Sequence, residues 1–165
     1  MLFVETSDEG WSAPAEPAVR AAVLATPFAA LATTLASIEV SVRFTSDAEV
    51  QTLNRQYRGK DAPTNVLSFP MVQPDLLEAV TAGSDDGEVL LGDIVLARET
   101  CEREAAERGV SVEAHAQHLI VHGVLHLLGY DHLDDAEGDA MEALETAAMR
   151  ALGLHDPYED RDTPR

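Results

Sequence analysis

Three histidines in the run HGVLHLLGYDH have the spacing of a metal site. His122 and His126 are four residues apart, so on a helix they lie on one face, where two imidazoles can reach one ion. Gly129 can adopt a left-handed conformation and turn the chain back, which brings His132 beside the pair. The pattern predicts three histidine ligands and an open fourth position, which is typical of a catalytic rather than a structural zinc site.

Two further histidines, His115 and His118, precede the pair on the same predicted helix. His118 and His126 are eight residues apart, which is about 12 Å of helix rise, whereas zinc–nitrogen bonds are about 2.0–2.1 Å long. We therefore predict that His115 and His118 are surface or packing residues. Zinc is the expected ion, although nickel, copper and iron also bind imidazoles. We expect Asp131, or the acids at 134, 135 and 137, to accept hydrogen bonds from the ligands.

The residue after the first histidine, Gly123, distinguishes this run from that of zinc peptidases, which carry a glutamate general base there. A zinc ion lowers the pKa of bound water to near 7, but glycine cannot pass a proton to the leaving amine of a peptide. Phosphodiester cleavage has a different requirement, because charge develops on phosphoryl oxygens and a metal with an arginine stabilises it. Arg58, after the second predicted helix, is the candidate. The alternative for Arg58 is a surface ion pair with Asp61.

Composition indicates one globular domain. The 165 residues, 45% of them hydrophobic, are enough to bury a core. We assign residues 1–157 to a single domain and 158–165 to a charged tail that we expect to be disordered. We find no apolar run of about 18 residues, no N-terminal signal pattern and one cysteine, Cys101. These features predict a cytoplasmic protein without a membrane partner.

The net charge of -19 discourages non-specific binding to nucleic acid. Three of the 11 basic residues nevertheless lie within six positions, Arg55, Arg58 and Lys60. This cluster is either a local contact for a polyanion or a solvated loop, and charge alone favours the loop.

The predicted elements are strands interleaved with helices, followed mainly by helices. Strand patterns occur at 2–5, 38–44, 65–70 and 89–97, the last with Gly92 at a bulge or close approach. Helix patterns occur at 18–35 with a break or start at Pro27, 46–57, 98–108, 111–128 and 135–152, and residues 71–88 are predicted to be a loop. This order indicates an α+β fold with a small mixed β-sheet of about four strands packed with about five helices.

The histidine run is similar to the signature of the YbeY family of bacterial metal-dependent endoribonucleases. The segments LNRQYRGKDAPTNVLSFP, LLGDIVLA and MEALETAAMRALG also resemble family segments, and the resemblance covers most of residues 38–157. It implies one zinc ion per chain held by His122, His126 and His132, a functionally important Arg58, and a metzincin-like fold around the metal. His122 and Arg58 are the expected catalytic residues, and Arg58, Lys60 and Ser68 the expected substrate contacts. A solvated loop for Lys60 and sheet packing for Ser68 are the alternatives.

The function that the resemblance implies is single-strand-specific cleavage of RNA in the maturation of the 16S rRNA 3′ end and in ribosome quality control. The implied partners are ribosomal RNA and the ribosome or its proteins. Because the chain is so acidic, a ribosomal protein or an assembly GTPase is expected to bring it to the substrate. Two other hypotheses remain open, a metallopeptidase-like hydrolase with an unusual base and a non-catalytic ribosome assembly factor with a structural zinc.

Overall fold

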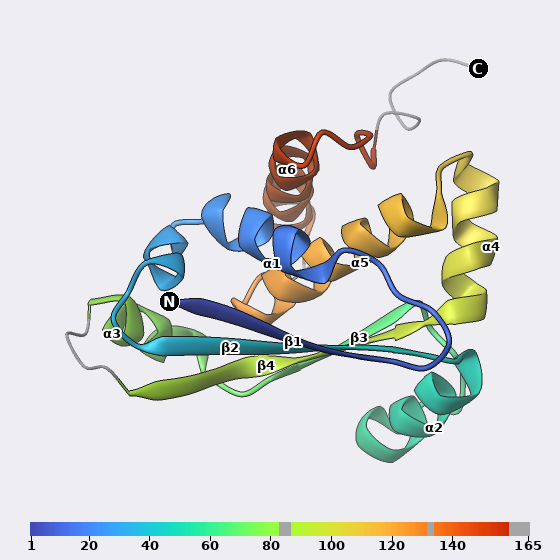
Figure 1. Ribbon diagram of the computed structural model, residues 1–165, viewed down its shortest axis with the longest axis horizontal. Helices are drawn as coiled ribbons and strands as arrows, with labels where there is room; N and C mark the ends of the chain where they lie inside the picture. Colours follow the sequence, from blue (N-terminus) through green and yellow to red (C-terminus); the bar gives the residue numbers. More distant parts are fainter. Residues whose placement is uncertain (83–86, 132–133, 159–165) are drawn as a thin grey trace.

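A four-stranded mixed sheet forms the centre of the computed structural model, which describes residues 1–82, 87–131 and 134–158 (Figure 1). Its strands are β1 (Leu2–Asp8), β2 (Ser37–Thr45), β3 (Val66–Pro70) and β4 (Glu88–Ala97). Their order is β1-β2-β4-β3, with β1, β2 and β4 parallel and β3 antiparallel to β4. This sheet confirms the predicted fold class and makes β3 an edge strand.

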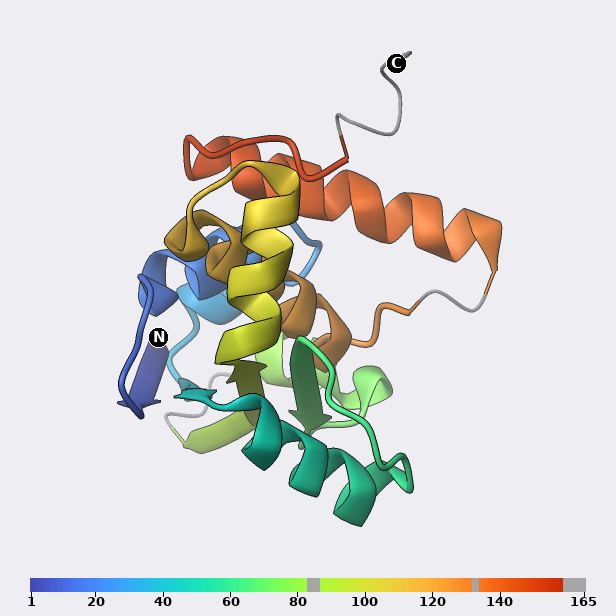
Figure 2. The same cartoon turned by 90° about the vertical axis from the view of Figure 1, so that its right-hand side faces the viewer.

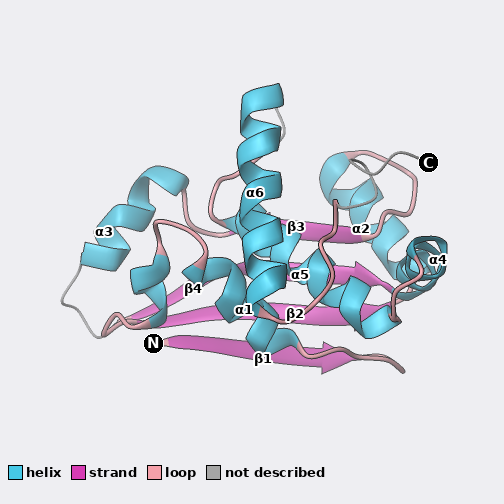
Figure 3. Cartoon of the chain, turned by 90° about the horizontal axis from the view of Figure 1, so that it is seen from above, coloured by secondary structure: helices cyan, strands magenta, loops and turns pink. Residues whose placement is uncertain are grey.

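Helices cover the two faces of the sheet unequally. The described helices are α1 (Ala15–Leu24), α2 (Asp47–Arg58), α3 (Leu77–Ala82), α4 (Arg98–Arg108), α5 (Val112–Leu127) and α6 (Asp135–Ala151), with 3-10 turns at Ala29–Ala32 and Pro74–Leu76. α1 and α5 lie over one face and α6 lies above them, whereas α2 lies below the sheet (Figures 1 and 2). In Figure 3, which looks down on the helical layer, α6 crosses above α1. None of the described helices is long and apolar enough to cross a membrane.

The described part of the segment 71–88 differs from the prediction, which was a loop, and residues 83–86 lie outside the described residues. The described part contains a 3-10 turn and the short helix α3. Leu77 is fully buried in the main core and fixes this helix to the body of the protein. By contrast, the helix break predicted at Pro27 is confirmed, because α1 ends at Leu24. There the hydroxyl of Thr26 donates to the carbonyl of Val23.

α5 is the buried central helix that the sequence predicted. The hydroxyl of Ser111 caps it by accepting a hydrogen bond from the amide of Ala114. From His115 to Leu127 every residue is buried except His122 and His126, which are half-buried. The two histidines therefore mark the one part of this stretch that meets the surface.

Gly92 lets the end of α5 come close to the edge of the sheet. A methyl group at Gly92 would lie 2.5 Å from Cδ2 of Leu127 and 2.6 Å from the carbonyl oxygen of Phe69. The pairing of β2 with β4 also shifts register opposite this residue, so the predicted bulge and close approach are confirmed. This contact places the C-terminal end of α5 against β3.

Candidate functional site

His122 and His126 face each other at the C-terminal end of α5. Their ring centroids are 4.5 Å apart, and their Nε2 atoms are 3.0 Å apart. Two nitrogen ligands of one tetrahedral zinc, with bonds of about 2.0–2.1 Å, lie roughly 3.3 Å apart. The structure thus brings two of the predicted ligands to a spacing close to that of a shared ion, and their role as ligands remains a prediction.

His132, the third predicted ligand, lies outside the described residues. The chain does turn where the sequence predicted, since Gly129 has a φ of 97° and the amide of Tyr130 donates to the carbonyl of Leu125. Within residues 1–82, 87–131 and 134–158, no group of three or more histidine, cysteine or acidic side chains is arranged to hold a metal ion. The third ligand of the predicted trio, His132, is not among these residues, so that part of the prediction is not tested.

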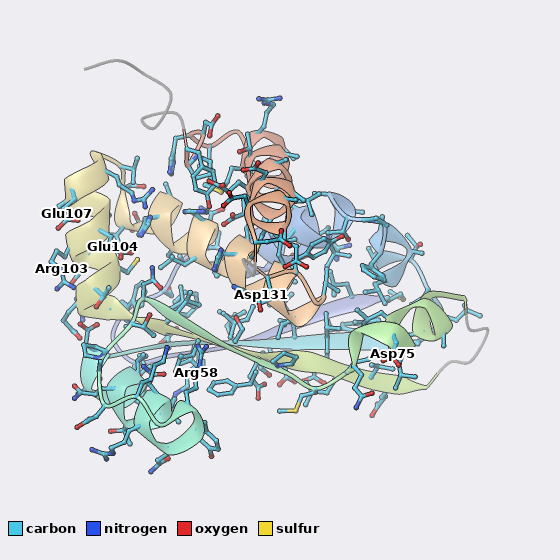
Figure 4. The ribbon with its side chains drawn as sticks, turned by 180° about the vertical axis from the view of Figure 1, so that it is seen from behind. Arg58, Asp75, Arg103, Glu104, Glu107 and Asp131 are labelled. Atoms are coloured by element: carbon cyan, nitrogen blue, oxygen red, sulfur yellow. The ribbon has the colours of Figure 1, made fainter. Side chains whose placement is uncertain are left out.

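The two histidines line a cavity of about 740 Å³. Arg58 lines it from the end of α2, Ser68 from β3, and Asp131 from the segment after α5. Figure 4 labels Arg58 and Asp131. The left-handed Gly59, with a φ of 70°, ends α2 directly after Arg58. Residues that are far apart in the sequence therefore share one cavity, and it combines imidazoles, a guanidinium and a hydroxyl.

The structure places only two of the three predicted substrate contacts in the cavity. Arg58 and Ser68 line the cavity, whereas Lys60 is exposed and is not among the lining residues. Asp61, the alternative partner of Arg58, instead contacts Arg55 at 3.7 Å. Arg58 thus lines the cavity beside the histidine pair, and its contact with substrate stays a prediction.

Gly123 packs directly on the sheet. A methyl group at this position would lie 3.1 Å from Cγ2 of Ile94 and 3.1 Å from Oγ of Ser68. A glutamate side chain would fit there only if these two side chains or α5 shifted. Packing therefore disfavours the general base that zinc peptidases carry at this position, and the sequence lacks it.

Glu145, on α6, contacts His122 and is not among the residues that line the cavity. Its side chain is fully buried, and Oε1 accepts hydrogen bonds from Nδ1 of His122 at 2.9 Å and from Nε2 of His118 at 3.0 Å. Burial by itself would raise the pKa of Glu145, but the hydrogen bonds from His118 and His122 outweigh burial and lower it. In a neutral imidazole that donates from Nδ1 to this carboxylate, the lone pair lies on Nε2, which faces Nε2 of His126.

The sequence prediction missed Glu145. It expected acceptors that follow the histidines closely in the chain, but Asp134 caps α6 by accepting from the amide of Glu137 at 2.8 Å. The signal in the sequence that could have identified Glu145 was helical periodicity. Met141, Glu145 and Ala148 share the buried face of α6, and a charged residue on an apolar face requires a buried partner.

His115 and His118 are packing residues and not surface residues, with exposed fractions of 1% and 5%. Nε2 of His115 lies 2.8 Å from a carboxylate oxygen of Glu104, which also accepts a hydrogen bond from Asn65. His118 contacts Glu145, as described above. Neither histidine lines the cavity.

Tyr158 was assigned to the start of the charged tail, but it contacts the buried network. Its hydroxyl donates to Oε2 of Glu145 at 2.6 Å, and its ring centroid lies 5.9 Å from that of His118. Burial, together with the negative charge of Glu145, raises the pKa of Tyr158. Residues 159–165 of the predicted tail lie outside the described part of the chain.

The fold and the cavity together define an α+β protein with paired imidazoles and an arginine in one open cavity. The family model described as Endoribonuclease YbeY matches residues 11–153, and the chain belongs to this family. The predicted family membership is thereby confirmed.

Individual relatives agree with this assignment. Proteins named Endoribonuclease YbeY from Sphingopyxis alaskensis and Rhizorhabdus wittichii are 66% and 62% identical to this chain. The alignments cover 98% and 90% of this chain and 100% and 87% of those proteins. The solution structure of TM1509 from Thermotoga maritima is similar in fold, with a TM-score of 0.55 and 23% identity over 99% of both chains.

Proposed function

We propose that this protein is a zinc-dependent endoribonuclease that cleaves single-stranded RNA, with the 3′ end of 16S rRNA as its substrate. The observation that carries the proposal is the convergence of two Nε2 atoms, 3.0 Å apart, in a cavity that Arg58 also lines. The names of the relatives, which describe endoribonucleases, support RNA as the substrate class.

The donor set suits zinc. Neutral imidazoles are ordinary zinc ligands, and His122, His126 and His132 would hold one ion per chain. When bound, such an ion acts as a Lewis acid and lowers the pKa of water. The family resemblance supports the same three residues. His122 would connect the ion to the buried carboxylate of Glu145, which its Nδ1 contacts.

Arg58 contacts the scissile phosphate in this proposal. Its planar guanidinium can form two parallel hydrogen bonds to phosphate oxygens, and its charge opposes the negative charge that develops there. Ser68, on the cavity wall, offers a hydroxyl to the same strand. Lys60 lies outside the cavity and would contact the RNA backbone beyond the cleaved bond.

The two alternative hypotheses are less well supported. Gly123 leaves no room for a proton carrier next to His122, which argues against a peptidase. The histidine pair lines an open cavity, whereas structural zinc sites are closed by four protein ligands, which argues against a purely structural ion.

The site of action in this proposal is the assembling ribosome in the cytoplasm. A net charge of -19 opposes contact with a polyanion. We therefore propose that a ribosomal protein, or an assembly GTPase, brings the enzyme to its substrate and adds the contacts that the acidic chain lacks.

The test is cleavage of a 3′-extended small-subunit rRNA fragment by zinc-loaded protein, beside the same fragment in a duplex and an unstructured peptide. We expect cleavage of the single strand alone. His122→Ala should abolish it, and Arg58→Ala should lower the rate by about 10²–10³-fold. Arg55→Ala is the matched control, because Arg55 is exposed on the same helix and pairs with Asp61 outside the cavity. Equal cleavage by wild type and His122→Ala, or cleavage of the peptide, would contradict the proposal.

A further inference from the structure

The hydrogen bonds behind His122 connect the proposed metal site to the C-terminal segment of the chain. We propose that Glu145 is a positioning residue that fixes the ring of His122, and that Tyr158 completes the hydrogen bonds of Glu145. This inference rests on the metal-dependent function proposed above. It adds a carboxylate and a segment of the chain that touch neither the ion nor the RNA.

Glu145 uses both carboxylate oxygens. Oε1 accepts from His118 and His122, which are four residues apart on α5, and Oε2 accepts from the hydroxyl of Tyr158. All three donors come from outside α6. An ionised carboxylate that is fully buried requires such partners, so the network is an interlocked unit rather than a chance contact.

The consequence for His122 is a fixed orientation. The hydrogen bond from Nδ1 to Glu145 limits rotation of the ring and directs Nε2 toward Nε2 of His126. Metal-binding histidines commonly donate their second N–H to a carboxylate, which sets the tautomer and makes the ligating nitrogen more basic. His118 is too deeply buried to reach the cavity, so its role is to hold Glu145 in place.

The segment that carries Tyr158 is attached to the rest of the protein at several points. Gly153, with a φ of 73°, turns the chain after α6, and a side-chain nitrogen of Arg108 donates to the carbonyl of Pro157 at 3.2 Å. The raised pKa of Tyr158 keeps its hydroxyl protonated and able to donate. The geometry of the histidine pair therefore depends on docking of this segment.

A purely structural role for Glu145 makes a different prediction. If the carboxylate only holds α5 against α6, its loss lowers stability and leaves metal affinity unchanged. If it positions His122, metal affinity and ligand geometry change as well. The test must therefore measure metal binding and stability in the same variants.

The experiment uses the full chain with zinc affinity measured by competition against a chromophoric chelator, the absorption spectrum of the cobalt(II)-loaded protein, and urea unfolding without metal. We expect Glu145→Gln to weaken zinc binding about 10–100-fold and to alter the cobalt spectrum. Tyr158→Phe, which removes one hydroxyl, should weaken binding by a smaller factor. Asp139→Asn, at an exposed position of α6, is the control and should match wild type.

The outcomes separate the inference from the function on which it rests. Wild-type zinc affinity and an unaltered cobalt spectrum in both variants would overturn the inference, even if stability falls, and would leave the proposed function standing. If Glu145→Gln does not fold, the zinc affinity and the cobalt spectrum of Tyr158→Phe alone decide whether the inference holds. Failure of wild type to bind zinc or cobalt would overturn the proposed function as well.

Discussion

The two nitrogens of the His122 ring have different partners, and this difference defines the site. Nδ1 donates to the buried Glu145, and Nε2 lies 3.0 Å from Nε2 of His126. Beside this ring, Gly123 keeps α5 in contact with the sheet. The ring of His122 is therefore held by a buried carboxylate, and the next position is crowded by Ile94 and Ser68. In the proposed function this arrangement suits cleavage of an anionic ester better than cleavage of a peptide.

Gly123→Glu restores the residue that zinc peptidases carry, and we expect it to damage the protein without creating a peptidase. The new side chain overlaps Ile94 and Ser68, and its charge would be buried, so the free energy of unfolding should fall by about 3 kcal/mol. Urea unfolding and a peptide cleavage assay measure both effects. Ala106→Glu adds the same charge at an exposed helical position. We expect this control to leave the free energy of unfolding nearly unchanged. A stable Gly123→Glu variant that cleaves peptide would contradict this account.

Residue types and spacing were enough to predict the histidine pair and to select Arg58. They could not predict Glu145, because its partner His122 lies 23 residues earlier on another helix. Sequence proximity suggested Asp131 or the acids at 134, 135 and 137 instead. The last three lie at the start of α6, whereas Asp131 lines the cavity and its role as an acceptor stays a prediction. Spacing along one helix determines which side chains share a face, but it does not determine which face of a second helix packs against them.

Among the elements, the ends of α2, β3 and α5 build the cavity together. The close packing at Gly92, where Leu127 and the backbone of β3 meet β4, sets the distance between α5 and the edge strand. Because His126 directly precedes Leu127, this packing also sets how far the histidine pair lies from Ser68 and Arg58.

Gly92→Ala should therefore lower both stability and cleavage. Its methyl group would lie 2.6 Å from a backbone oxygen that cannot rotate away, and overpacking of this kind costs about 1–3 kcal/mol. Gly87→Ala is the control, since no atom lies within 4 Å of a methyl group there, and we expect a change of less than about 0.5 kcal/mol. Urea unfolding distinguishes the two variants, and equal stabilities would show that the close approach is not needed.

Several elements were predictable because their signals are local. The hydroxyl of Ser46 accepts from the amide of Glu49 at the start of α2, as the capping pattern indicated. α3 was not predictable, because its six residues are too few to show helical periodicity and the burial of Leu77 fixes it. Local signals also could not predict that Arg58 and His122 line the same cavity. Their proximity depends on how α2 and α5 pack at the same edge strand.

At the scale of the whole molecule, acidic residues gather on the sheet face that α5 does not cover. Glu5 and Asp93 line a second cavity there, and a hydrogen bond with Glu5, followed by the charge of Glu5, raises the pKa of Glu39. Arg58 lines the other cavity, beside the histidines. Arg43 also lines the second cavity, and Asp131 lines the histidine cavity, so each cavity combines an arginine with acidic side chains. In the proposed function the RNA phosphate lies in the histidine cavity, because the proposed metal ligands lie there.

Binding of single-stranded RNA should depend only weakly on salt. Each phosphate neutralised on a single strand contributes about -0.7 to the slope of log K against log salt concentration. With Arg58 and Lys60 as the two contacts, the slope should be about -1.4. Fluorescence anisotropy with the inactive His122→Ala variant measures it. A slope steeper than about -4 would reveal a basic contact surface that this account lacks.

The most direct test of the central claim is removal and return of the metal. We would strip the protein with a chelator, record its helical circular dichroism, and then titrate zinc while following cleavage of the 3′-extended rRNA fragment. The packing of α5 among α1, α6 and the sheet predicts that the stripped protein keeps its helical signal but loses cleavage. One equivalent of zinc should restore activity in wild type and not in His122→Ala. Cleavage that survives stripping, or unfolding of the protein when the metal is removed, would contradict a catalytic metal at this histidine pair.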